Sequence, residues 1–318
     1  MGKLFRRLLQ FFTGRRVCAL TALLLIFASA CSGPRNAAGK DAAAALRVVV
    51  TFDALYEIAS EIGGDRVSVT NIMPAGAEPH HFEPRARDLE ALGTADVFVV
   101  CGLGFDAWAR GAASAAGNSG MLLCDASRGV EPIAASGAAA ESSGQRQDSE
   151  GYDPHIWLSL SCAAVMAENI ADAFAEADPG GADLYRGNSD EFSRRAGELF
   201  EEYARKLDAS GSRTIVTGHA VFAYLCRDFS LAQLSVEGAF AEGEPSARAL
   251  AELVDLCRER GVRVILTEDA SSPLVAETLA AEAGAVVAEI YTMELAEDGL
   301  SYFERMERNL AVILEALA

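Results

Sequence analysis

The chain has 318 residues, of which 51% are hydrophobic and 23% charged, and its formal net charge is −19. A folded body this acidic disfavours binding to nucleic acid or to anionic lipid. The length is sufficient for two domains of ordinary size, each with its own core.

Residues 1–31 are predicted to be a lipoprotein signal peptide. Five basic and no acidic side chains precede Val17–Ala30, an apolar run too short for a lasting membrane span. Small residues then lead to Cys31, as in a bacterial lipobox, although Ala28 stands where leucine is usual. We expect lipidation of Cys31, which would anchor the protein on the extracytoplasmic side of a membrane. The alternative is secretion after cleavage at Ala30.

Residues 32–45 are rich in alanine and are predicted to be a flexible tether. From residue 46 onward, continuous apolar strands alternate with helical patterns. The predicted strands are 46–52, 67–73, 96–101 and 121–124. The predicted helices are 54–62, 86–94, 105–116 and 163–177. This alternation indicates a parallel sheet covered by helices on both faces.

The second half of the chain repeats this alternation after a polar loop at 132–151 and a long helix at 190–207. The predicted strands are 214–217, 231–236, 262–267 and 286–291. The predicted helices are 247–260, with an N-cap at Ser246, 273–283 and 302–317. We therefore expect an α/β fold of two Rossmann-like lobes with mainly parallel sheets, at 46–179 and 210–318. A long helix within 180–209 would join them.

Five cysteines follow the predicted lipidation site, and none shows the C-x-x-C spacing. They are Cys101, Cys124, Cys162, Cys226 and Cys257. An odd number in an exported chain cannot all pair internally. We expect most of them to be small buried hydrophobic residues, and one disulfide could form, with no pairing favoured.

All four histidines lie in three short motifs. His80 and His219 each follow a predicted strand, and ligand sites in open α/β sheets form at the carboxyl ends of strands. His155 lies between the polar loop and a helix. Neutral imidazole is the commonest protein ligand for zinc-like metals, so the three positions together predict one metal site. His81 adjoins His80 and is expected to face solvent. Singly, each histidine could equally be an ordinary polar or core residue.

Four ordered motifs carry a resemblance to a known family. They are Gly76-x-Glu78-Pro79-His80-x-Phe82-Glu83-Pro84, Asp153-Pro154-His155-x-Trp157, Thr217-Gly218-His219-Ala220-x-Phe222-x-Tyr224 and Glu242-x-Glu244-Pro245-Ser246. In order and spacing they resemble the solute-binding lipoproteins of bacterial zinc and manganese ABC importers, over nearly all of residues 46–318. The resemblance implies two lobes joined by one rigid helix, an ion held between them, and His80, His155 and His219 as ligands.

The sequence leaves the fourth ligand open. The resemblance implies an aspartate at the position that Met293 occupies, and a thioether suits a hard or borderline dication poorly. Glu294, Glu268 or a water molecule could complete the site, and we take Glu294 as the working assignment. Three imidazoles and at most one carboxylate favour Zn²⁺ over Mn²⁺, with iron and nickel also compatible.

The resemblance implies a monomeric, non-enzymatic, periplasmic or surface lipoprotein that delivers its metal to an ABC permease. A zinc-dependent hydrolase is one alternative, because three histidines and an open position also describe catalytic zinc. The sequence has no H-E-x-x-H motif, and Glu83 is the nearest candidate base. A surface adhesin of the same fold is the other alternative.

Overall fold

The first half of the folded chain forms a four-stranded parallel sheet. The computed structural model describes residues 45–74, 82–135, 151–237, 247–268, 273–295 and 299–318. The strands are β1 (Leu46–Val50), β2 (Val67–Asn71), β3 (Val97–Val100) and β4 (Leu122–Asp125), in the spatial order β2-β1-β3-β4. All three pairings are parallel, as the alternation of apolar strands with helices predicts.

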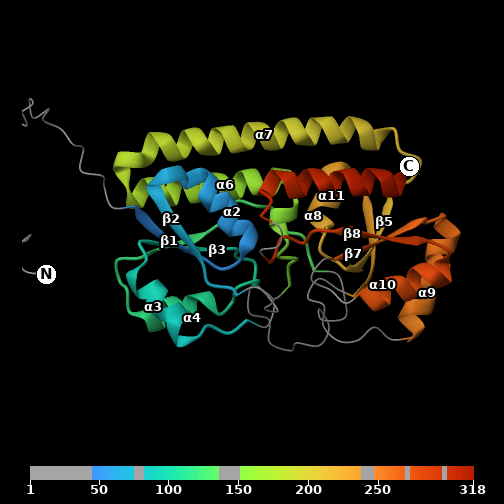
Figure 1. Ribbon diagram of the computed structural model, residues 1–318, viewed down its shortest axis with the longest axis horizontal. Helices are drawn as coiled ribbons and strands as arrows, with labels where there is room; N and C mark the ends of the chain where they lie inside the picture. Colours follow the sequence, from blue (N-terminus) through green and yellow to red (C-terminus); the bar gives the residue numbers. More distant parts are fainter. Residues whose placement is uncertain (1–44, 75–81, 136–150, 238–246, 269–272, 296–298) are drawn as a thin grey trace, which may run out of the picture. The chain divides into compact units, whose positions relative to one another are not determined.

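Helices cover both faces of this first sheet (Figure 1). On one side lie α3 (Ala86–Thr94) and α4 (Ala109–Ala116), and on the other lie α2 (Asp53–Gly63) and α6 (Leu160–Ala177). The short 3₁₀ turns η1 (Gly64–Arg66) and η3 (Ile156–Leu158) precede β2 and α6. The helix predicted at 163–177 therefore begins three residues earlier, where the Ser159 side chain accepts a hydrogen bond from the Cys162 amide.

The second sheet has the same topology. Its strands are β5 (Thr214–His219), β6 (Ala232–Glu237), β7 (Val264–Glu268) and β8 (Val286–Ile290), in the order β6-β5-β7-β8, and all pairings are parallel. Its helices are α8 (Ala223–Phe229), α9 (Ala247–Arg260), α10 (Pro273–Ala283) and α11 (Tyr302–Leu317). The predicted α/β class with two parallel sheets is therefore confirmed.

The longest helix lies where the sequence predicts a connector. After the 3₁₀ turn η4 (Pro179–Gly181), α7 runs over Ala182–Asp208 and contacts α2 and α6 as well as α11. Figure 1 shows it lying above these helices, on the side away from α3 and α4. None of the helices described by the structure combines the length and apolar character needed to cross a membrane.

Several local expectations were wrong. The long helix predicted at 190–207 begins eight residues earlier, at Ala182. The structure adds α8, which the sequence pattern did not indicate. Helix α4 begins at Ala109 rather than at residue 105, because the Asp106 carboxylate accepts hydrogen bonds from the amides of Cys101 and Gly102 and folds the preceding residues into a turn. The N-cap predicted at Ser246 lies outside the described residues, as do the tether and the signal peptide.

The five cysteines of the folded body are all buried and free, so the expectation of small hydrophobic cysteines is confirmed and no disulfide forms among them.

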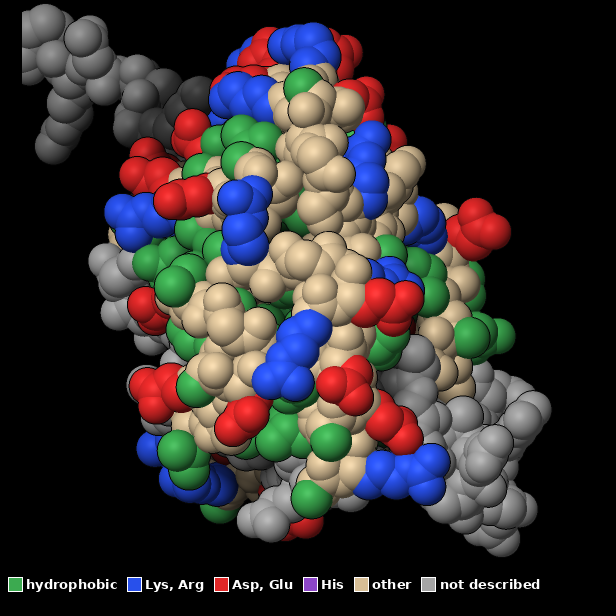
Figure 2. All heavy atoms as spheres, turned by 90° about the vertical axis from the view of Figure 1, so that its right-hand side faces the viewer, with side chains coloured by type: hydrophobic (Ala, Val, Ile, Leu, Met, Phe, Trp, Pro, Cys, Tyr) green, Lys and Arg blue, Asp and Glu red, His purple; other side chains and the backbone are tan. Residues whose placement is uncertain are grey.

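The molecular surface is mixed in charge. Figure 2 shows one face, on which Lys and Arg are interspersed with Asp and Glu around small apolar areas. The acidic excess is therefore not gathered into a single patch on this face.

Candidate metal centre

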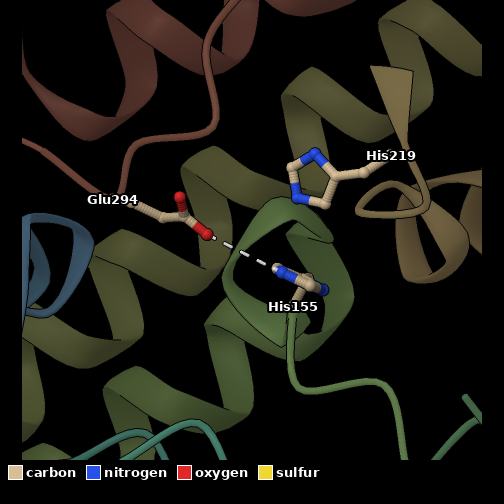
Figure 3. Close-up of side chains that lie close together, drawn as sticks. All are labelled: His155, His219 and Glu294. Atoms are coloured by element: carbon tan, nitrogen blue, oxygen red, sulfur yellow. Dashed lines mark ion pairs between the residues drawn. The ribbon is translucent and has the colours of Figure 1, made fainter. Parts of the chain in front are cut away.

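Two imidazoles and one carboxylate converge in the interior (Figure 3). The ligand atoms of His155, His219 and Glu294 all lie within 4.8 Å of one another, and this is the one such group among the described residues. The His155 Nε2 atom lies 3.7 Å from Glu294 Oε1. Two ligands that each bind a tetrahedral Zn²⁺ at about 2.0–2.1 Å lie roughly 3.3 Å apart, so this pair is close to the spacing that the ion requires.

His155 is held by the residues before it. The Asp153 Oδ1 atom accepts hydrogen bonds from the His155 backbone amide at 2.9 Å and from His155 Nδ1 at 2.8 Å. The Tyr224 hydroxyl donates to the Asp153 carbonyl at 2.7 Å. A carboxylate on Nδ1 fixes the tautomer of a ligating histidine and leaves Nε2 as the electron-pair donor. That nitrogen is the one that faces Glu294.

Aromatic rings enclose His155, which is fully buried. Its ring centroid lies 5.1 Å from that of Trp157 and 6.5 Å from that of Phe105. Burial lowers the pKa of His155 below its usual value, while the Asp153 charge and hydrogen bond oppose this effect. The imidazole is therefore neutral at pH 7, which is the form that binds metals.

His219 ends strand β5 and is positioned by a second carboxylate, from the end of β7. The Glu268 Oε1 atom accepts from the backbone amides of Gly218 at 3.0 Å and His219 at 3.1 Å, and lies 3.6 Å from His219 Nδ1. A Cβ atom on Gly218 would lie 2.5 Å from Glu268 Oε2. Glycine in this motif therefore leaves room for the carboxylate that orients the histidine.

The sequence-predicted site residues have different outcomes. His155, His219 and Glu294 come together, while Glu268 lies behind His219 and orients it. His80 and His81 lie outside the described residues, and their roles stay predictions. Sequence reasoning missed the roles of Asp153 and Tyr224, although both stand within the quoted motifs. The signal was present, since an Asp two residues before a His in an Asp-Pro-His turn readily accepts from that residue's amide.

Replacing Asp153 with alanine is expected to weaken zinc binding by about 10–100-fold, because outer carboxylates orient a ligating imidazole and raise its basicity. A chelator-competition titration would measure the change. Asp208→Ala removes an exposed carboxylate that pairs with Arg213, and it should leave zinc affinity unchanged. Equal affinities for the two variants would contradict the assigned role of Asp153.

The fold has two parallel sheets covered by helices, and its interior holds a cluster of imidazole and carboxylate groups. These features are those of a solute-binding protein for a divalent metal. A model of the family described as "Zinc-uptake complex component A periplasmic" matches residues 48–316. The chain belongs to this family. Members of the family are solute-binding proteins that work with ABC importer permeases. The match to this family confirms the resemblance seen in the sequence.

Individual relatives agree with this assignment. A Treponema pallidum protein, provisionally named as metal-binding, is 39% identical over 305 residues, covering 94% of this chain and 96% of that protein. The high-affinity zinc uptake system protein ZnuA of Bacillus subtilis is 31% identical, over 86% and 88% of the two chains. The zinc-bound structure of a glutamate-to-glutamine variant of AdcAII from Streptococcus pneumoniae has a TM-score of 0.78 at 30% identity, over 86% and 99%.

Proposed function

We propose that this protein captures Zn²⁺ outside the cytoplasm and delivers it to an ABC importer permease. The observation that carries the proposal is the buried convergence of His155, His219 and Glu294. Two imidazoles and a carboxylate form a donor set that suits zinc. The zinc-uptake family to which the chain belongs supports the same reading.

The proposed ligand set is His80, His155, His219 and Glu294. His80 is included on the basis of its sequence motif alone, because it lies outside the described residues. With three nitrogen donors and one oxygen donor, the site should prefer Zn²⁺ to Mn²⁺, because manganese favours more oxygen ligands. Zinc is here the transported solute. The family match does not favour the hydrolase or the adhesin alternative, and we expect a monomer.

The direct experiment is metal analysis of protein purified without added metal, followed by competition titrations with Zn²⁺ and Mn²⁺. We expect bound zinc, and tighter binding of zinc than of manganese. Tighter binding of manganese would overturn the choice of metal. Zinc-dependent turnover of ester, amide or phosphate substrates would revive the hydrolase alternative.

The proposed location depends on Cys31. Cys31→Ser should release the protein from the membrane fraction or leave it unprocessed, because the thiol carries the lipid. Cys18→Ser, a matched change within the same predicted signal peptide, should leave membrane retention intact. Fractionation and immunoblotting would measure both. A cleaved Cys31→Ser product that stays with the membrane would contradict lipid anchoring.

A further inference from the structure

The turn that carries Glu294 is held by its backbone carbonyls. Four consecutive carbonyls, at residues 291–294, each accept a hydrogen bond from a different donor. The donors are Asn309 Nδ2 at 2.8 Å, Trp157 Nε1 at 2.7 Å, the Ala54 amide at 3.0 Å and the Asp53 amide at 3.3 Å. Thr292, Met293 and Glu294 are at most 4% exposed, so these three residues of the turn lie in the interior.

The donors come from three separate elements. Asn309 lies on α11 and also accepts from the Tyr291 amide at 2.8 Å, so its side chain pairs with this backbone as a neighbouring strand would. Trp157 lies in η3, two residues after His155. The amides of Asp53 and Ala54 are the first of α2, where the N-cap residue supplies no side-chain bond. The turn therefore caps this helix N-terminus.

The conformation of the turn depends on these bonds. Met293 has φ of 58°, in the left-handed region that side chains other than glycine adopt rarely. Surrounding structure must hold such a residue in place. Since Met293 directly precedes Glu294, its backbone conformation decides where the Glu294 carboxylate points.

We propose that Trp157 and Asn309 are positioning residues that aim the Glu294 carboxylate at His155 and so set the affinity and coordination geometry of the metal site. This inference rests on the proposed function. Neither side chain is a ligand. Trp157 couples the positions of His155 and Glu294 directly. It follows His155 by two residues, and its side chain binds the carbonyl of Thr292, two residues before Glu294.

The test uses Asn309→Ala and Trp157→Phe in the full-length protein. Trp157→Phe keeps an aromatic ring against Phe52 and Phe105 but removes the Nε1–H donor. The matched control is Asn118→Ala. Asn118 likewise donates from Nδ2 to backbone carbonyls, those of Leu92 and Ala95. These residues precede strands β3 and β4 of the first sheet.

Two readouts separate positioning from general loosening of the structure. Zinc affinity should fall by roughly 10-fold or more in Asn309→Ala and Trp157→Phe and stay unchanged in Asn118→Ala. The visible absorption of bound Co²⁺, which depends on coordination number and geometry, should shift toward that of Glu294→Ala. In a Glu294→Ala background, Asn309→Ala and Trp157→Phe should have little further effect, because there is no carboxylate left to position.

Full additivity with Glu294→Ala, or a wild-type Co²⁺ spectrum in both variants, would overturn the inference. If Asn309→Ala fails to fold, the result of Trp157→Phe decides. An unchanged zinc affinity in Glu294→Ala would overturn the positioning role while leaving zinc capture by the histidines intact. Zinc binding that is indifferent to His155→Ala would instead overturn the proposed function.

Discussion

Replacing His155 or His219 with alanine is expected to weaken zinc binding by roughly 10²–10³-fold. Structural zinc sites bind with about 10–16 kcal/mol, so each of four ligands contributes roughly 3 kcal/mol, and about 1.4 kcal/mol corresponds to a tenfold change. Both imidazoles are buried. Competition against a chelator of known zinc affinity would measure the loss.

Comparison variants make this prediction specific. His80→Ala should behave like the two histidine variants, whereas His81→Ala should have little effect. Glu294→Ala should weaken binding less than any of the three, since water can replace a single carboxylate oxygen. Glu268→Ala should act only through the orientation of His219, by about 10–100-fold. A loss in His81→Ala as large as in His80→Ala would mean that the wrong neighbour had been chosen.

The sequence predicts the sheets well because their strands are unusually regular. Runs such as Val97–Val100 are fully buried, and parallel strands covered on both faces must be apolar throughout. Helices α3, α9, α10 and α11 begin and end where their patterns predict. Helix α8 was not predicted from the sequence, for a physical reason. It has only seven residues, of which Tyr224, Leu225, Cys226 and Phe229 are buried, and so short an apolar segment does not show a recognisable helical period.

The candidate site was predictable only in part. Histidines at strand ends can be recognised in the sequence, because the carboxyl ends of parallel strands meet at one edge. The choice among Glu294, Glu268 and water could not be made in this way, since it depends on where the backbone directs each carboxylate, and Met293, directly before Glu294, has a left-handed conformation. The donors that hold this turn come from α11, which follows it, and from α2 and η3, which lie far away in the sequence. Tertiary contacts of this kind leave no local pattern.

A buried ion pair supports the same region of the fold. The Arg305 Nη1 atom of α11 lies 2.5 Å from Asp53 Oδ2, and the two residues are 1% and 3% exposed. Helix α11 packs against β5 and β8 of the second sheet, whereas α2 packs against β1 and β2 of the first. The pair therefore links elements of both sheets. Asp53 is also the residue whose amide binds the Glu294 carbonyl.

Arg305→Met is expected to lower the free energy of unfolding by about 3–5 kcal/mol, because it leaves the Asp53 carboxylate buried without its partner. Chemical denaturation of the metal-free protein would measure the change. Arg194→Met is the matched control. Its guanidinium pairs with Glu191 and Glu198 on the exposed face of α7, and loss of such pairs costs about 1 kcal/mol or less.

The double variant Asp53→Leu/Arg305→Met separates the two causes of this loss. If the main cost of Arg305→Met is an unpaired buried charge, removal of that charge should restore much of the stability, since apolar replacements of a buried pair are often tolerated. The restored protein should also bind zinc nearly as tightly as the wild type, because the Asp53 amide that holds the Glu294 carbonyl belongs to the backbone. A double variant no more stable than Arg305→Met would show that the lost stability comes from packing around Arg305 rather than from the charge of Asp53.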